Sequence, residues 1–95
     1  MDYEWDEAKR LTNLKKHGVN FADIDEFDWA ASVDWIDDSE NYGEERLLAL
    51  GPFRGRIYSV AYTERRGMTR IISFRKATRK EIERYEKEKD RSSGL

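Results

Sequence analysis

The stretch that decides the fold runs from Thr69 to Tyr85, TRIISFRKATRKEIERY. It begins as an apolar strand and enters a helix through Thr78 to Glu81. A Thr followed three residues later by a Glu is typical of a capping box, in which each side chain accepts a hydrogen bond from the other residue's backbone N–H. The sequence therefore predicts a strand that leads directly into a helix beginning at Thr78.

Basic residues gather at this junction, namely Arg75, Lys76, Arg79 and Lys80. The first turn of a helix carries a partial positive charge, and its backbone N–H groups favour anions. The junction is therefore predicted to attract phosphate.

Upstream of this stretch the chain predicts a short strand and two helices. Tyr3 and Trp5 alternate with charged residues over 2–5. Asp6 is a plausible N-cap for a helix with Ala8, Leu11, Leu14 and Lys15 at helical spacing, and this helix ends at Gly18. Asn20 resembles the N-cap of a second short helix, whose apolar side is Phe21, Ile24 and Phe27.

Residues 31–74 change to an alternating period that is typical of strands. Strands are expected from 31, over 45–51, over 56–64 and over 68–74, with a polar loop at 37–43 and turns at 52–55 and 65–67. Short connections favour an antiparallel meander of about four strands. With two N-terminal helices and one C-terminal helix (78 to about 89), this predicts an α+β two-layer domain.

The composition fits one small domain, expected over 1–90, followed by a polar tail at 91–95. The chain has 95 residues, 40% of them charged, and no Cys. The lack of Cys excludes disulfides and thiolate chemistry. No apolar run approaches the roughly 20 residues that cross a bilayer, and the charged N-terminus is unlike a signal peptide. We expect no membrane association and a cytoplasmic location.

The net charge of -2 conceals two blocks of opposite sign. Residues 21–45 hold ten acidic residues and no Lys or Arg, whereas residues 46–80 hold ten basic residues and the single acid Glu64. Such blocks can steer an anion to one surface and a basic partner to another. The alternative interpretation is ordinary surface charge with intramolecular pairing.

Few catalytic chemistries fit these residues. The acids Asp34, Asp37, Asp38 and Glu40 lack the spacing of a calcium loop, and His17 has no second His or Cys beside it. No phosphate-binding glycine pattern and no nucleophile elbow is present. Cleavage of RNA requires fewer special residues, because the RNA 2′-hydroxyl is the nucleophile. The protein has to supply only positive charge and proton transfer.

The candidate site residues follow from that requirement. Arg75 and Arg79 are the first choices to bind the phosphate, with Lys76 and Lys80 as lesser ones. Lys16 and His17 end the first helix, where His17 can move a proton or simply complement the helix dipole. Tyr62 is a packing residue, a base-stacking one or the group that transfers a proton in place of His17. Arg46 contacts phosphate or pairs with Glu44.

Several motifs together resemble the BrnT toxins of bacterial type II toxin-antitoxin systems. They are Trp5-Asp6-Glu7-Ala8-Lys9-Arg10, Asn13, Lys16-His17-Gly18-Val19, Phe21, Tyr42-Gly43-Glu44-Glu45-Arg46, Tyr62-Thr63, and Arg70 to Glu81. The resemblance covers about residues 4–86. Phe74 departs from it, since the family more often has a small residue there, and this predicts an aromatic ring that crowds the site or stacks on a base.

The resemblance implies a RelE-like fold and a metal-independent endoribonuclease, an mRNA interferase that inhibits translation and needs no cofactor. It implies a BrnA-like ribbon-helix-helix antitoxin as partner in a hetero-oligomer, with operator DNA bound only through the antitoxin. The resemblance implies an active surface of Lys16, His17, Arg75 and Arg79, with Arg46 and Tyr62 beside it. We therefore expect Lys16, His17, Arg75 and Arg79 to be catalytic, and the substrate-binding residues to be Arg46, Tyr62, Ser73, Lys76 and Lys80. The alternative is a non-catalytic binding module or corepressor that acts through its antitoxin complex.

Overall fold

The computed structural model describes residues 2–38 and 43–93. Part of the expected polar loop, including Glu40, lies outside these residues. The elements follow one another along the chain as β1 (Tyr3–Trp5), α1 (Glu7–His17), η1 (Phe21–Glu26), η2 (Trp29–Ala31), β2 (Val33–Asp37), β3 (Arg46–Phe53), β4 (Arg56–Arg65), β5 (Met68–Lys76) and α2 (Arg79–Ser93).

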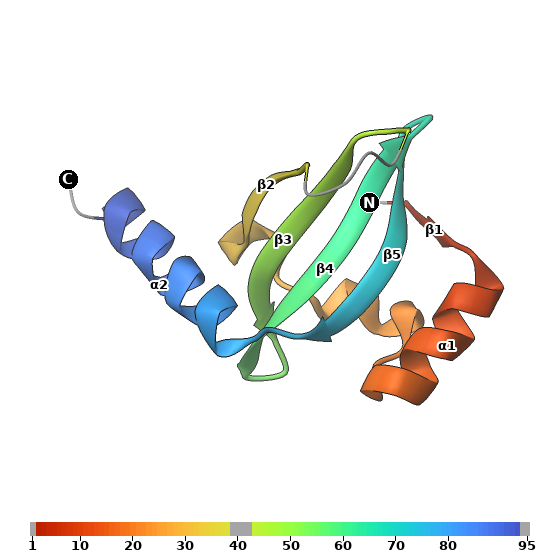
Figure 1. Cartoon of the computed structure of the whole chain (residues 1–95), viewed down its shortest axis with the longest axis horizontal. Coiled ribbons are helices and arrows are strands. Elements are labelled where there is room, and N and C mark those ends of the chain that lie inside the picture. Colours follow the sequence, from red (N-terminus) through yellow and green to blue (C-terminus); the bar gives the residue numbers. More distant parts are fainter. Residues whose placement is uncertain (1, 39–42, 94–95) are drawn as a thin grey trace.

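One five-stranded sheet organises the domain, in the order β1-β5-β4-β3-β2. The strands β2 to β5 form the antiparallel meander that the sequence predicts. β1 adds a feature that the sequence did not indicate, because it pairs with β5 in parallel, with Tyr3 opposite Thr69 and Trp5 opposite Ile71. The first strand and the last strand are thus neighbours at one edge of the sheet (Figure 1).

Two tight turns close the β3–β4 and β4–β5 hairpins of the meander. Arg54 and Gly55 connect β3 to β4 with φ values of 49° and 81°, and Arg66 and Gly67 connect β4 to β5 with φ values of 50° and 79°. Two successive positive φ angles fit the turn type that matches the twist of antiparallel strands. The first turn is shorter than expected, since β3 extends to Phe53.

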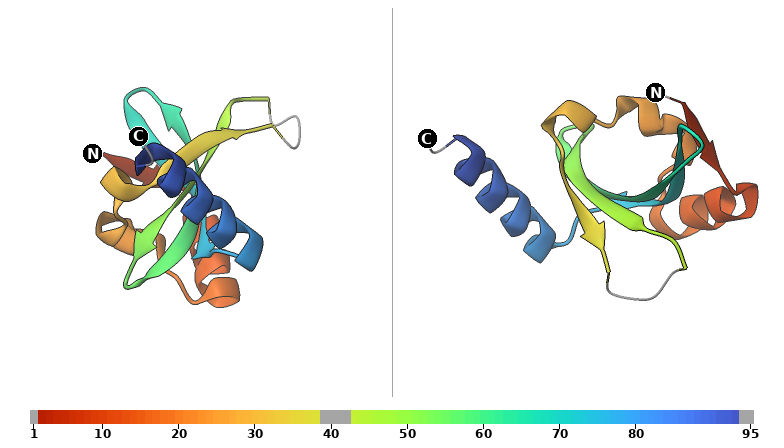
Figure 2. Two further views of the ribbon diagram at one scale, coloured as in Figure 1. Left: turned by 90° about the vertical axis from the view of Figure 1, so that its left-hand side faces the viewer. Right: turned by 90° about the horizontal axis from the view of Figure 1, so that it is seen from above.

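The hydrophobic core lies on the face of the sheet that curves around η1 and η2 (Figure 2). Its most buried aromatic residues, Phe21 and Phe74, have no exposed surface. Phe74 packs edge-to-face against Phe27, Phe53 and Tyr58. The expectation that Phe74 crowds the site or stacks on a base is therefore wrong, because the ring points into the core.

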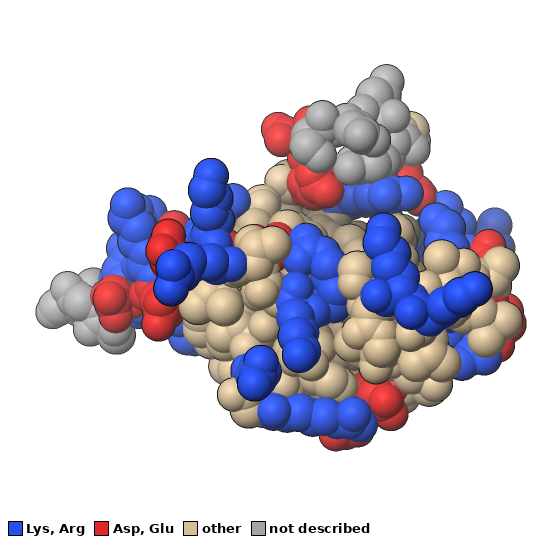
Figure 3. Space-filling view, turned by 60° about the horizontal axis from the view of Figure 1, so that its bottom comes forward, with Lys and Arg blue, Asp and Glu red and all other residues tan. Residues whose placement is uncertain are grey.

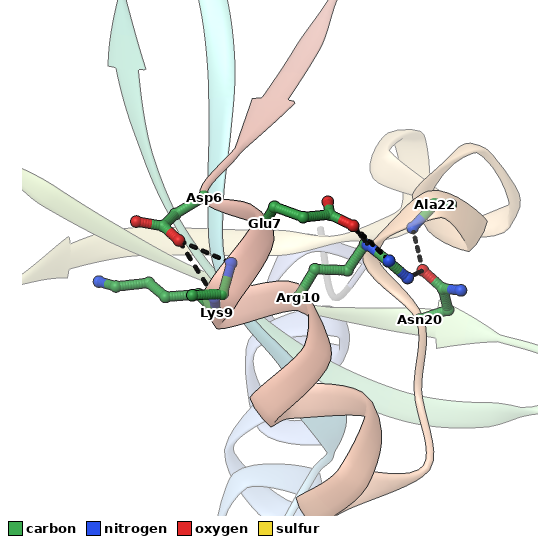
Figure 4. A network of polar contacts seen from close by, with 7 residues as sticks. Asp6, Glu7, Lys9, Arg10, Asn20 and Ala22 are labelled. Atoms are coloured by element: carbon green, nitrogen blue, oxygen red, sulfur yellow. Dashed lines mark hydrogen bonds and ion pairs between the residues drawn. The ribbon is translucent and has the colours of Figure 1, made fainter.

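The helix α1 begins and ends as its sequence predicts. The Oδ1 atom of Asp6 accepts hydrogen bonds from the backbone N–H groups of Ala8 and Lys9, and Gly18 ends the helix with a φ of 71°. Arg10 bonds Glu7 on the same helix and, at 3.4 Å, the Oδ1 of Asn20 (Figure 4). The same Oδ1 accepts from the N–H of Ala22, so Asn20 caps the second helical segment and joins it to α1.

That second segment, η1, is a 3-10 helix, and η2 follows it as a further short 3-10 helix.

The apolar spacing of α1 suggests a buried apolar face that the structure does not have. Leu11 and Leu14 remain 53% and 37% exposed, and the buried residue of the helix is the polar Asn13. A hydrogen-bonded side chain, and not an apolar stripe, therefore attaches α1 to the sheet.

The C-terminal helix α2 lies outside the curve of the sheet and projects away from it (Figure 2). The Tyr85 hydroxyl donates to the carbonyl oxygen of Ala31 at 2.9 Å, and the Arg84 guanidinium lies 3.6 Å from the ring centre of Trp35. The helix continues to Ser93, beyond its expected end near Lys89 and into the expected tail. Within residues 2–38 and 43–93, no helix is long and apolar enough to span a membrane.

Candidate active site

A β-bulge in β5 decides which residues face away from the core. Tyr62 pairs with Ile71, whereas Ala61 pairs with Ser73, so Ile72 is an extra residue in β5. Strict alternation would place Ile71 and Phe74 on opposite faces, since they are three residues apart. The bulge lets both enter the core, and it places Ser73 and Arg75 together on the outer face.

Arg75 extends from the end of β5 to the first turn of α2. Its Nη1 and Nη2 atoms donate to Glu81 Oε1 and Oε2 at 2.8 and 3.0 Å. Glu81 also accepts from the Thr78 N–H at 2.8 Å and returns a 3.2 Å bond from its own N–H to the Thr78 hydroxyl. The predicted capping box is confirmed, and one carboxylate serves both the cap and the arginine.

The charges of this pair stabilise each other. Burial alone would raise the pKa of Glu81, but the hydrogen bonds from Arg75 and Thr78 outweigh it and leave the pKa lowered. The bond to Glu81 in turn raises the pKa of Arg75. Both groups are therefore ionised at neutral pH, and the guanidinium is held at the turn where Arg79 and Lys80 also begin the helix.

The C-terminal end of α1 lies beside this arginine. His17 and Lys16 are exposed there. Burial lowers the pKa of His17, and the positive charges of Lys16 and Arg75 lower it further. His17 is therefore mainly neutral at pH 7, with an imidazole nitrogen able to accept a proton.

An open pocket of about 500 Å³ is lined by residues of both α1 and β5 at the same place. Its lining includes Lys16 and His17 from the helix and Ile72 and Ser73 from the strand, and it continues along α1 to Asp6, Lys9 and Thr12. We call the residues Lys16, His17, Ser73 and Arg75 the α1–β5 corner. The corner combines two cations, a mainly neutral histidine and a hydroxyl. Lys16, His17 and Ser73 line the pocket, and the charge of Arg75 acts on His17.

The positive charge extends beyond the corner. Seen from below, the molecule carries Lys and Arg side chains across the middle of one face, with Asp and Glu mostly at its margins (Figure 3). Part of the basic block is paired, as the alternative interpretation expected. Arg54 bonds Glu26 at 2.7 Å, Arg65 bonds Glu44 at 2.9 Å, and Arg70 bonds Glu4 at 3.0 Å.

Three of the expected substrate-binding residues lie apart from the corner or at its border. Lys76 pairs across the sheet with Tyr58 and lines a separate pocket of about 300 Å³ with Ile57 and Ile82. Lys80 is exposed in the first turn of α2. Arg46 begins β3 opposite Asp37. Leu50 of β3 is level with Ser59 and Arg75, and Arg46 lies four residues before it, or about 13 Å along the strand at 3.3 Å per residue.

Tyr62 lies on the core face of the sheet, opposite the corner. The residue is 7% exposed, and its ring packs edge-to-face on Trp29 with centroids 5.1 Å apart. Its hydroxyl donates to the Asp34 carboxylate. Burial and that carboxylate raise its pKa well above the ordinary value. The burial and contacts of Tyr62 favour packing over base stacking or proton transfer at the corner.

Sequence reasoning missed the contacts that assemble the corner. Asn13 was noted only as part of a resemblance, and Glu81 only as a helix cap. The bulge had a visible signal, because the apolar residues Ile71, Ile72 and Phe74 break the alternation of a strand. Among the described residues, no group of three or more Asp, Glu or His side chains lies close enough to hold a metal ion.

Comparison with known proteins adds one finding. A family model described as a ribonuclease toxin, BrnT, of type II toxin-antitoxin systems matches residues 5–81. The matched range begins in β1 and ends at Glu81, so it contains the whole α1–β5 corner. No curated protein matches the chain.

Proposed function

The chain belongs to the BrnT family of ribonuclease toxins of type II toxin-antitoxin systems, and we propose that it cleaves RNA at the α1–β5 corner. The observation that carries this proposal is the position of His17, which lines the pocket with Lys16 and lies close enough to Lys16 and Arg75 for both charges to lower its pKa. An RNA phosphate bound there would meet cations and a proton acceptor together.

The proposed reaction is attack of the RNA 2′-hydroxyl on the adjacent phosphorus. A bond forms between the 2′ oxygen and phosphorus, and the bond from phosphorus to the 5′ oxygen breaks. One proton leaves the 2′-hydroxyl and one is gained by the 5′ oxygen. The products are a 2′,3′-cyclic phosphate and a 5′-hydroxyl, and no metal ion is required because the substrate supplies the nucleophile.

Each residue of the corner has a proposed role. Arg75 binds the non-bridging oxygens, and Arg79 and Lys16 add positive charge as negative charge grows on the phosphate. His17 accepts the proton of the 2′-hydroxyl, for which its neutral form is suited. The Ser73 hydroxyl lines the pocket and contacts the bound nucleotide. Lys76, Lys80 and Arg46 contact phosphates farther along the RNA.

The family also supports a proposal about partners. Type II systems pair the toxin with a protein antitoxin, and we propose a BrnA-like ribbon-helix-helix protein that forms a hetero-oligomer with this chain. Operator DNA would be bound through that antitoxin. Without the antitoxin, the toxin would cut messenger RNA in the cytoplasm and inhibit translation. Its domain would have the RelE-like fold.

The direct test uses the purified chain without its antitoxin. Cleavage of an RNA oligonucleotide in the presence of EDTA is expected, whereas the same oligonucleotide with 2′-O-methyl groups should stay intact because its nucleophile is blocked. In cells without the antitoxin, an Arg75→Ala, Arg79→Ala double variant should neither arrest growth nor cut RNA. If it does both as well as the wild type, the assignment of these arginines is wrong.

A second candidate function is a binding module or corepressor without catalysis. The observation in its favour is the ion pair between Arg75 and Glu81, which by itself is a common structural arrangement at a helix start. A folded, purified chain that binds its antitoxin but leaves RNA uncut would establish this alternative. Growth arrest alone would not separate the two functions, because a tight binder can also be harmful.

A further inference from the structure

The hydrogen bonds of Arg75 leave one edge of its guanidinium unused. A guanidinium carries five N–H groups. Nη1, with two of them, donates to Glu81 Oε1 at 2.8 Å and to the Lys76 carbonyl oxygen at 3.1 Å, and Nη2 donates once, to Glu81 Oε2 at 3.0 Å. The Nε–H and the second N–H of Nη2 have no partner among the described residues.

These two remaining donors lie side by side on the same edge of the planar group. Two parallel N–H groups form the fork with which arginine binds two oxygens of one phosphate. The Arg75 side chain is 30% exposed, so solvent reaches part of it, while Glu81 is covered to a greater extent at 18%. Arg75 Nε has no hydrogen-bond partner and is not among the fully buried unpartnered atoms of the described residues, so this edge is open to a ligand.

We propose that Glu81 is a positioning residue that turns the Nε and Nη2 fork of Arg75 toward the RNA phosphate. This inference depends on the proposed ribonuclease function of the corner. An arginine side chain has several rotatable bonds, and without a partner it would present any of its edges to the substrate. By occupying the end of the guanidinium, the carboxylate fixes which edge remains for the phosphate before RNA arrives.

Glu81 is itself fixed by the helix that carries it. The Thr78 N–H binds the same Oε1 atom that Arg75 binds, and the Thr78 hydroxyl accepts from the Glu81 backbone. The bond from the Thr78 N–H holds the Glu81 carboxylate and does not depend on the side chain at position 78, whereas the hydroxyl bond stabilises only the start of the helix. In this arrangement the strand end and the helix start are coupled through a single carboxylate.

Two matched substitutions separate positioning from capping. Glu81→Gln keeps an oxygen for the cap, since Gln also serves in capping boxes, but it cannot receive both Nη atoms of Arg75. Thr78→Ala removes the hydroxyl from the cap and leaves the Arg75–Glu81 pair in place. Single-turnover cleavage of RNA and the Kd for the 2′-O-methyl oligonucleotide are measured below the unfolding temperature of each variant.

We expect Glu81→Gln to lower the cleavage rate by about tenfold or more, and Thr78→Ala to change it by less than about twofold once folding is matched. In an Arg75→Lys background, which has no fork, Glu81→Gln should add no further loss. The inference would be overturned if Glu81→Gln and Thr78→Ala lowered the cleavage rate equally. It would also be overturned if Glu81→Gln lowered the rate as much in the Arg75→Lys background as in the wild type. If the wild type neither cuts nor binds RNA, the proposed function fails, and this inference fails with it.

Discussion

The side-chain amide of Asn13 binds both backbone polar groups of Phe74. Its Nδ2 donates to the Phe74 carbonyl oxygen at 2.7 Å, and its Oδ1 accepts from the Phe74 N–H at 3.2 Å. β1 pairs with β5 only as far as Ile71, so the edge of β5 beyond this residue is open. Asn13 completes that edge in place of a strand, and it thereby holds the end of α1 next to Ser73 and Arg75.

Replacement of Asn13 by Ala should therefore loosen the corner. The substitution leaves the Phe74 groups and the Val19 carbonyl oxygen without their partner. Unsatisfied buried groups cost roughly 1–3 kcal/mol, so we expect the free energy of unfolding to fall by about 2 kcal/mol in urea titration. Leu11→Ala, at a site that is 53% exposed, is the control and should change it by less than about 0.5 kcal/mol. Equal stability of the two variants would refute the role of Asn13.

The titration of His17 tests its proximity to the corner cations. The chain has one His, so a single imidazole signal can be followed by NMR, and its pKa should lie below 6.5 in the wild type. Lys16→Gln should raise this pKa because a nearby positive charge is lost. Lys87→Gln, in the helix at the opposite end of the molecule (Figure 1), should leave it unchanged.

The sign of the pH dependence follows from the same shift. Because the pKa of His17 is lower in the folded chain than in the unfolded one, the unfolded chain binds the proton first as the pH falls. The contribution of His17 to stability is therefore complete above about pH 6.5 and is lost as the pH falls through the folded pKa. His17→Gln should remove this part of the pH dependence, and an unaltered stability profile would contradict the shift.

Tyr62→Phe distinguishes packing from substrate contact. The substitution removes the hydroxyl that donates to Asp34, and the lost hydrogen bond should lower the free energy of unfolding by about 1 kcal/mol. Because the residue faces the core, the RNA cleavage rate of the folded variant should stay within about twofold of the wild type. A large loss of RNA cleavage by a fully folded Tyr62→Phe variant would show that Tyr62 contacts the substrate.

Gly51 tests the close packing of β3 on the segment before β2. A Cβ at this position would lie 2.9 Å from Phe27 Cζ and 3.0 Å from Ser32 Cβ. We expect Gly51→Ala to lower the free energy of unfolding by about 1–3 kcal/mol, as overpacking does. Adding Phe27→Leu, which removes the nearest atom, should cost less than the sum of the two separate changes. Simple additivity would show that the contact with Phe27 is not the cause.

The sequence was informative wherever local chemistry determines structure. The caps at Asp6, Asn20 and Thr78 and the Arg66-Gly67 turn were predicted because each depends on residues only a few positions apart. The meander followed from alternation and short loops. These local signals also brought Arg75 to the start of α2, where the structure has it.

What the sequence did not indicate depends on contacts between distant segments. The parallel pairing of Tyr3 with Thr69 and the bonds of Asn13 to Phe74 join residues that only the complete fold brings together. Leu11 shows the same limit. The apolar spacing of α1 indicates a possible buried face, but the hydrogen bonds of Asn13 bury a different face of the helix, and Leu11 stays exposed. The site residues therefore stay a prediction, and the contacts that orient them could be found only in the complete fold.

The most direct measurement of the central claim is the single-turnover cleavage rate of RNA, in EDTA, by Arg75→Ala compared with Arg54→Ala. Both variants lose one positive charge, but Arg54 lies at the β3–β4 turn in an exposed pair with Glu26. The account predicts that Arg75→Ala cleaves about a hundredfold more slowly than the wild type, as expected for the loss of a transition-state donor. It predicts that Arg54→Ala cleaves within about twofold of the wild type. A folded Arg75→Ala protein that cleaves as fast as Arg54→Ala would contradict the account.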